Sequence, residues 1–64
     1  NPANSVLNIE VLENTQISVI DMLGKKIHIQ NLQSGHNKID VSSFGSGLYF
    51  IKNQNGESLK FVKN

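Results

Sequence analysis

Cysteine, tryptophan and arginine are absent from this 64-residue sequence, and these absences exclude several kinds of site. Without cysteine the chain can form neither a disulfide framework nor a thiolate zinc site, although this does not identify its compartment. Six lysines against five carboxylates give a net charge of +1, which provides no dense basic surface for phosphate groups. Three Phe and one Tyr are too few for a base-stacking platform, so we do not expect nucleic acid as a partner.

Long apolar runs are missing as well. No stretch approaches the roughly 20 residues of a membrane-spanning helix, so we expect no membrane span. The polar start Asn1-Pro2-Ala3-Asn4 is unlike a secretory signal peptide. If this domain is exported, we therefore expect its N-terminal signal to lie on a larger precursor. A chain of this length can form one domain with one thin core, and we treat residues 1–64 as a single domain.

Apolar and polar residues alternate with a period of two, which is typical of strands with one buried and one exposed face. This pattern predicts six strands, at residues 7–11, 17–19, 25–30, 38–41, 48–51 and 59–63. A seventh is expected in the first residues or around residues 31–34. The composition of residues 31–37 and 42–47 predicts loops, and no stretch predicts a helix. The chain is therefore expected to be all-β, as a small sandwich or barrel.

Two of these strands carry specific expectations about their faces. Alternation from Lys25 to Gln30 places Ile27 and Ile29 on one face. The continuously apolar run from Leu48 to Ile51 predicts a central strand that is covered on both sides. The predicted core consists of Leu7, Ile9, Ile17, Val19, Ile27, Ile29, Ile39, Leu48, Phe50 and Phe61.

Glycine-containing turns separate the strands. Asp21 and Gly24 are predicted to form a hairpin turn, because an Asp side chain accepts hydrogen bonds from nearby backbone amides and Gly permits positive φ. Asn55-Gly56 has the composition of a two-residue type I′ hairpin. Gly47 is expected to provide either positive φ or a close backbone approach at the start of its strand.

Candidate catalytic and metal-binding residues do not assemble into a known pattern. The sequence gives His28 and His36 no further ligand at diagnostic spacing, and Ser42 and Ser43 lack a nucleophile-elbow pattern. The sequence Gly45-Ser46-Gly47 opens a strand rather than a helix, unlike a phosphate-binding loop. We therefore expect no enzyme activity, no metal and no cofactor.

Several short motifs together resemble the C-terminal sorting domain, type A, of the type IX (Por) secretion system. Each motif is weak alone, but their order and spacing cover almost the whole chain. The opening Asn1-Pro2-Ala3 lacks the Tyr-Pro part of the family's usual start. The motifs that carry the resemblance are Asp21-Met22-Leu23-Gly24-Lys25, Gly35-His36-Asn37-Lys38-Ile39-Asp40-Val41, Gly47-Leu48-Tyr49-Phe50 and Lys60-Phe61-Val62-Lys63.

This resemblance implies an antiparallel immunoglobulin-like β-sandwich of six or seven strands at the C-terminus of a larger exported precursor. The domain would be a non-catalytic secretion signal, covalently linked to an N-terminal cargo. It would pass through the periplasm, be recognised by the outer-membrane translocon, and be removed by a sortase-like peptidase as the cargo reaches the cell surface or is secreted. Its partners would be that translocon and that peptidase.

The terminal strand is the predicted recognition element, through Lys60, Phe61, Val62 and Lys63. An ordinary edge strand protected by lysines explains the same pattern. Two other functions stay open: an accessory module that binds carbohydrate, and a structural spacer. A carbohydrate-binding module would show exposed aromatic residues, whereas the single Tyr, Tyr49, lies in the most apolar strand and is interpreted as structural.

Overall fold

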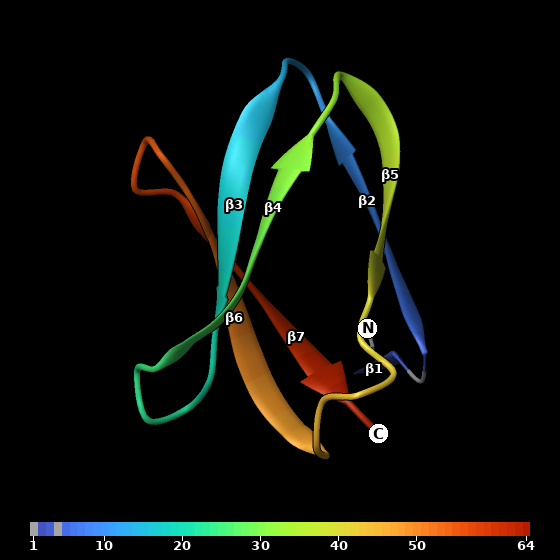
Figure 1. The fold of residues 1–64 in the computed structure, drawn as a ribbon, viewed down its shortest axis with the longest axis vertical. Helices are drawn as coiled ribbons and strands as arrows, with labels where there is room; N and C mark the ends of the chain where they lie inside the picture. The colour runs from blue at the N-terminus through green and yellow to red at the C-terminus, as the bar shows by residue number, and fades with distance from the viewer. Residues whose placement is uncertain (1, 4) are drawn as a thin grey trace.

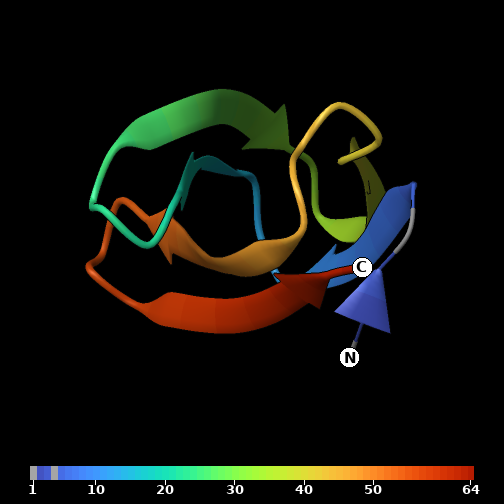
Figure 2. The same ribbon diagram turned by 90° about the horizontal axis from the view of Figure 1, so that it is seen from below.

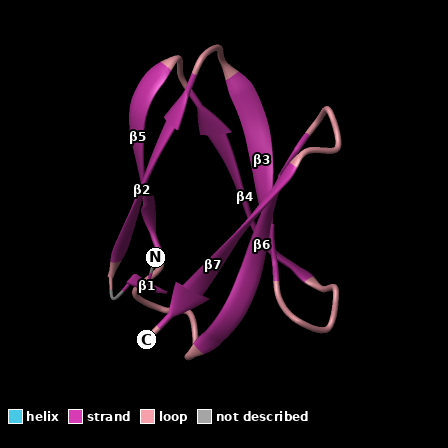
Figure 3. Ribbon diagram, turned by 180° about the vertical axis from the view of Figure 1, so that it is seen from behind, coloured by secondary structure: helices cyan, strands magenta, loops and turns pink. Residues whose placement is uncertain are grey.

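The computed structural model describes residues 2–3 and 5–64, so Asn1 and Asn4 of the opening motif lie outside the described residues. Figure 3 shows strands joined by loops, and the described residues contain no helix. The all-β prediction is confirmed. The strands are β1 (Pro2–Ala3), β2 (Val6–Val11), β3 (Thr15–Ile20), β4 (Lys26–Leu32), β5 (Gly35–Asp40), β6 (Gly47–Asn53) and β7 (Ser58–Lys63).

These strands form two sheets that face each other (Figures 1 and 2). The larger sheet has the order β1-β7-β6-β3-β4, and the smaller one pairs β2 with β5. This is immunoglobulin-like topology: β2 and β5 correspond to strands B and E, and β7-β6-β3 to strands G-F-C. All pairings are antiparallel except that of β1, which runs parallel to β7. The seventh strand is therefore formed by the first residues.

The core lies between the inner faces of the two sheets. Tyr49 and Ile51 of β6 point inward, beside Ile17 and Val19 of the neighbouring β3. Phe61 of β7 lies opposite Tyr49, and the two rings stack with centroids 5.4 Å apart. The complete buried set is Leu7, Ile17, Val19, Leu32, Ile39, Val41, Tyr49, Ile51 and Phe61.

Two predictions for β6 were wrong: which of its residues face the core, and that both faces of the strand are covered. Leu48 and Phe50 lie on the outer face of the large sheet and are only half-buried, whereas Tyr49 and Ile51 are buried. In the described part of the chain β6 is central within its sheet, but the small sheet covers only the inner face. A continuous apolar run does not itself reveal which alternate residues face the core.

The prediction for Ile29 was also wrong, because a β-bulge interrupts β4. The register of β3 with β4 shifts between Val19 and Ile20, which face His28 and Lys26 respectively. The additional residue, Ile27, packs against the core, and Ile29 is left 54% exposed. A bulge exchanges the faces of all residues on one side of it, and the sequence alternation alone does not show this.

The loop predicted at residues 31–37 is much shorter than expected. β4 continues to Leu32, which is 1% exposed, and β5 begins at Gly35. Only Gln33 and Ser34 connect the two strands. Side-chain hydrogen bonds hold this connection: the Ser34 amide donates to Asn14 Oδ1 at 2.8 Å. The expected loop at residues 42–47 is observed up to Ser46, since β6 begins at Gly47.

Candidate functional site

The candidate recognition strand β7 has one buried and one exposed face. Phe61 and Lys63 point inward and are 2% and 8% exposed, respectively. Lys60 and Val62 lie on the outer face of the large sheet, next to Phe50 and Leu48 of β6. Of the four predicted recognition residues, only Lys60 and Val62 therefore present their side chains to solvent.

Burial of Lys63 changes the interpretation of the terminal lysines. The terminal motif predicts that both lysines are available to a receptor, but only Lys60 is exposed. Lys63 Nζ donates a hydrogen bond to the carbonyl of Asn64 at 3.2 Å. A buried lysine packs its alkyl chain against apolar neighbours and keeps its ammonium group at the boundary of the core. Lys63 is therefore positioned to hold the end of the strand in place.

The outer edge of β7 is only partly paired. β1 pairs with Val62 and Lys63, through Pro2 and Ala3. In the described part of the chain, no strand pairs with this edge along residues 58–61. Unpaired backbone N–H and C=O groups at a sheet edge can accept a further strand.

Gly47 and Tyr49 fix the start of β6. Gly47 has φ of +148°, the positive φ that the sequence analysis gave as one alternative, and no atom lies within 4 Å of a Cβ placed there. Close backbone approach is therefore not its role. The Tyr49 hydroxyl donates a 2.6 Å hydrogen bond to the carbonyl of Gly45. This arrangement matches the tyrosine corner of immunoglobulin-like domains, in which a tyrosine near the start of strand F bonds backbone a few residues upstream.

Asp21 and Gly24 form the turn between β3 and β4. Asp21 Oδ1 accepts hydrogen bonds from the amides of Leu23 and Lys25, both at 2.9 Å. The amide of Gly24, with φ of +86°, donates to the Asp21 carbonyl at 3.0 Å. Asp21 Oδ1 and the Asp21 carbonyl oxygen therefore both stabilise the turn, which supports a structural role for this residue.

Asn55 and Gly56 form a turn of the same design rather than the predicted type I′ turn. Type I′ requires positive φ at both central residues, but only Gly56 has it. The residue that the sequence analysis missed is Asn53, whose Oδ1 accepts the amides of Asn55 at 3.0 Å and Glu57 at 2.9 Å. Its position three residues before the glycine, as for Asp21, was the available signal. This spacing fits a type I turn followed by a glycine bulge.

Ser42 and the two histidines also have structural partners. Ser42 donates its hydroxyl to Asp40 Oδ1 at 2.6 Å and its amide to the same atom at 3.0 Å. These two bonds hold the pKa of Asp40 below its ordinary value of 3.8, because they favour the charged carboxylate. His28 contacts Gln30 Oε1 at 2.9 Å, and His36 contacts Asn8 Oδ1 at 3.3 Å.

The described residues contain no group of three or more His, Cys, Asp or Glu side chains arranged to hold a metal ion. Nor do they include a helix long and apolar enough to cross a membrane. The aromatic residues Phe44, Tyr49 and Phe61 form one cluster with 5.4 Å between neighbouring centroids, in which Tyr49 stacks on Phe61 and Phe44 is tilted against Tyr49. Only Phe50 lies apart, half-buried on the outer face of the large sheet.

Comparison with known families agrees with the motifs and the fold. The family model for the secretion system C-terminal sorting domain matches residues 1–64, which is the whole sequence. The chain belongs to this family. This sorting domain is thus a type IX secretion signal, and the family implies export to the cell surface or secretion. Neither the search of curated proteins nor the search of solved structures finds a match for it.

Proposed function

We propose that this sorting domain is a non-catalytic ligand of the type IX translocon, attached to the C-terminal side of an exported cargo. The observation that carries the proposal is the family match across all 64 residues. An N-terminal signal on the precursor delivers the cargo and domain to the periplasm, where the translocon recognises the folded domain. A sortase-like peptidase then removes the domain from the cargo.

The recognition element in this proposal is the exposed part of β7. Lys60 and Val62 supply a cationic and an apolar side chain on the outer face of the sheet. The unpaired edge along residues 58–61 supplies backbone hydrogen-bonding groups. A receptor strand added to this edge would bind through its backbone and select its partner through alternate side chains. Phe61 and Lys63 contribute by holding β7 on the core.

A non-catalytic role is supported by how the polar side chains are used. Ser42, in the loop that follows β5, donates its hydroxyl to Asp40 at the end of that strand, and each histidine is bonded to an amide side chain. A nucleophile requires a base within hydrogen-bond reach and a group that orients that base. The described contacts contain no such series, so the domain is proposed to be a substrate and ligand of the secretion machinery.

Substitutions in β7 test this proposal better than a truncation. Deleting residues 60–64 would remove Phe61 from the core and would unfold the domain along with any recognition surface. The test therefore uses two reporters that are delivered to the periplasm. One is fused to wild-type residues 1–64, and the other is fused to the same residues with both Lys60→Glu and Val62→Ser. The wild-type fusion is expected at the cell surface. The double variant is expected to stay in the periplasm, with thermal unfolding that shows a retained fold.

The variant Lys38→Glu is the matched control, because Lys38 is an exposed lysine on β5 of the other sheet. Equal export of the β7 variant and the control would overturn recognition by β7, while export of the wild-type fusion would still support sorting. Peptidase removal has a separate measurement, the mass of the surface reporter. A reporter that retains all of residues 1–64 would contradict that step.

A further inference from the structure

The outer face of the large sheet carries a row of four side chains that crosses four strands. Lys60 of β7 is the register partner of Phe50, which faces Ile20 of β3 on its other side. Ile20 is in turn the partner of Lys26 on β4. The row therefore has a cation at each end and two apolar side chains between them, and it spans about 14 Å at a strand spacing of about 4.8 Å.

Apolar residues of this face are left without a covering layer in the described part of the chain. Ile20, Leu48 and Phe50 are half-buried, and Val62 beside Leu48 is 43% exposed. The small sheet packs only against the opposite face, as Figure 2 shows. A contiguous apolar patch with a polar border is the usual mark of a protein interaction site.

The border of this patch is positively charged. Lys26 and Lys60 end the central row, and Lys52 lies in the next row on β6, opposite Ser18. Within the described structure no carboxylate lies in the central row or in the row of Lys52, and Asp21 lines a depression next to Leu48. Asp21 and Glu57 are bonded in turns, Glu10 and Asp40 belong to the small sheet or its end, and Glu13 lies in the loop between β2 and β3.

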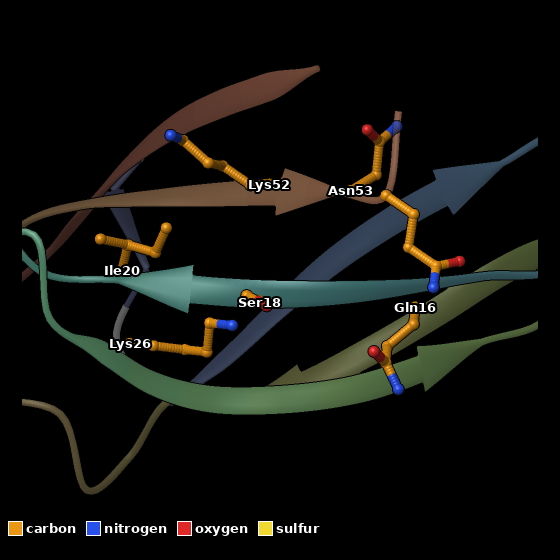
Figure 4. A pocket seen from close by; sticks show the side chains of 7 residues that line it. Gln16, Ser18, Ile20, Lys26, Lys52 and Asn53 are labelled. Atoms are coloured by element: carbon orange, nitrogen blue, oxygen red, sulfur yellow. The ribbon is translucent and has the colours of Figure 1, made fainter. Parts of the chain in front are cut away.

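A shallow depression of about 380 Å³ lies on this face beside the patch. Ser18 lies between Ile20 and Gln16 on β3, and its small side chain leaves the depression open. Figure 4 shows Lys26 extending toward Ser18, whereas Lys52 extends away from it over the neighbouring strand. The two ammonium groups are therefore spread along the face, which suits several carboxylates of one partner better than a single small anion.

We propose that this face docks an acidic polypeptide surface of the secretion machinery, with an apolar centre and carboxylates around it. The inference rests on the proposed function and extends recognition from β7 to Ile20, Lys26, Phe50 and Lys52. Apolar contact in the centre with complementary charge at the rim is the usual arrangement of a protein interface. An anionic bilayer would attract the same lysines, but it would not require apolar residues enclosed between two cations.

The test uses the periplasmically delivered reporter fused to residues 1–64, with Lys52→Glu, Lys52→Arg and the control Lys38→Glu. Lys52 and Lys38 are both exposed, but they lie on opposite sheets. Lys52→Glu is expected to lower surface export by about tenfold, since it replaces an attraction at the interface rim by a repulsion. Lys52→Arg and Lys38→Glu are expected to export like the wild type, and all variants should keep the wild-type unfolding midpoint.

Normal export of Lys52→Glu would overturn the inference while leaving the sorting function intact. Failure of the wild-type fusion would overturn the sorting function and, with it, this inference. Equal losses of surface export for Lys52→Arg and Lys52→Glu would show that the partner does not recognise the charge at residue 52, and this would also overturn the inference. In a second arm, the purified wild-type and Lys52→Glu fusions are mixed with vesicles of phosphatidylcholine containing phosphatidylglycerol. Binding of the wild type but not of Lys52→Glu to these vesicles would show that the partner is a membrane surface and not a polypeptide.

Discussion

The two faces of the large sheet bury the apolar residues of the same strands to different degrees. On the inner face, Val19, Ile51 and Phe61 are each at most 3% exposed and form the core with the small sheet. On the outer face, Ile20 and Phe50 come from two of these three strands, β3 and β6, but are only half-buried. The comparison shows that the apolar residues of one strand can be buried in the core on one face and left partly exposed on the other.

The lysines of the large sheet also differ in burial between its two faces. Lys63 is buried at the inner face, whereas Lys26, Lys52 and Lys60 border the outer one. Substitutions on the inner face should therefore reduce the free energy of unfolding, and substitutions on the outer face should change export with little effect on stability. The predictions below test this division.

The largest difference is expected between Phe61→Ala and Phe50→Ala. Phe61 is 2% exposed and stacks on Tyr49, so its removal should cost about 3–5 kcal/mol, comparable to the whole stability of so small a domain. Phe50→Ala should cost less, about 1–2 kcal/mol, because that side chain is only partly buried. Chemical denaturation of both variants measures the difference. Equal losses would show that the two faces are not energetically distinct.

Gly47→Val tests the backbone at the start of β6. A β-branched residue at φ of +148° should cost about 1–3 kcal/mol through backbone strain, although space for the side chain is available. Gly45→Ala is the control, since Gly45 lacks positive φ and its added Cβ would meet only the Tyr49 hydroxyl, at 4.0 Å. Thermal unfolding should show a clear loss for the first variant and a small change for the second. The reverse order would contradict this account.

Tyr49→Phe isolates the hydrogen bond of the tyrosine corner. The change removes the donor to the Gly45 carbonyl but keeps the aromatic stack, so we expect a loss of about 1 kcal/mol. The loss should appear in the denaturation midpoint with an unchanged slope. A variant as stable as the wild type would show that the bond at Gly45 does not stabilise the corner.

The smallest effect on the free energy of unfolding is expected from Asp40, and this effect depends on pH. Its folded-state pKa is lowered by the side-chain and backbone bonds from Ser42, so its contribution is present above the ordinary value of 3.8. The contribution is lost as the pH falls through the lowered folded-state value. Asp40→Asn should therefore be less stable than the wild type near neutral pH and should converge with it in strong acid. Parallel pH profiles of the two proteins would contradict this assignment.

Much of the fold could be predicted from the sequence, since the period-two pattern located most strands and the family motifs specified the sandwich. The errors have local causes. The bulge at Ile27 exposed Ile29, and the apolar run of β6 concealed which residues face inward. The turn after β6 depends on Asn53, whose side-chain bonds were not apparent from the Asn55-Gly56 pair.

The candidate recognition surface was only partly predictable. The terminal motif predicted Lys60 and Val62 together with Phe61 and Lys63, and the structure leaves only the first two exposed. The row from Lys60 to Lys26 joins two pairs of consecutive strands, β6-β7 and β3-β4, that are distant from each other in sequence, and it depends on three pairings and on the bulge in β4. Only the folded structure places these residues side by side.

The most direct measurement of the central claim is surface export of one reporter in two otherwise identical hosts, with and without the type IX translocon. The reporter is delivered to the periplasm in both hosts and carries residues 1–64 at its C-terminus. The account predicts surface reporter only in the host with the translocon, and periplasmic reporter in the other. Equal surface levels in both hosts, or a periplasmic reporter in both, would contradict the claim that these 64 residues are a sorting signal.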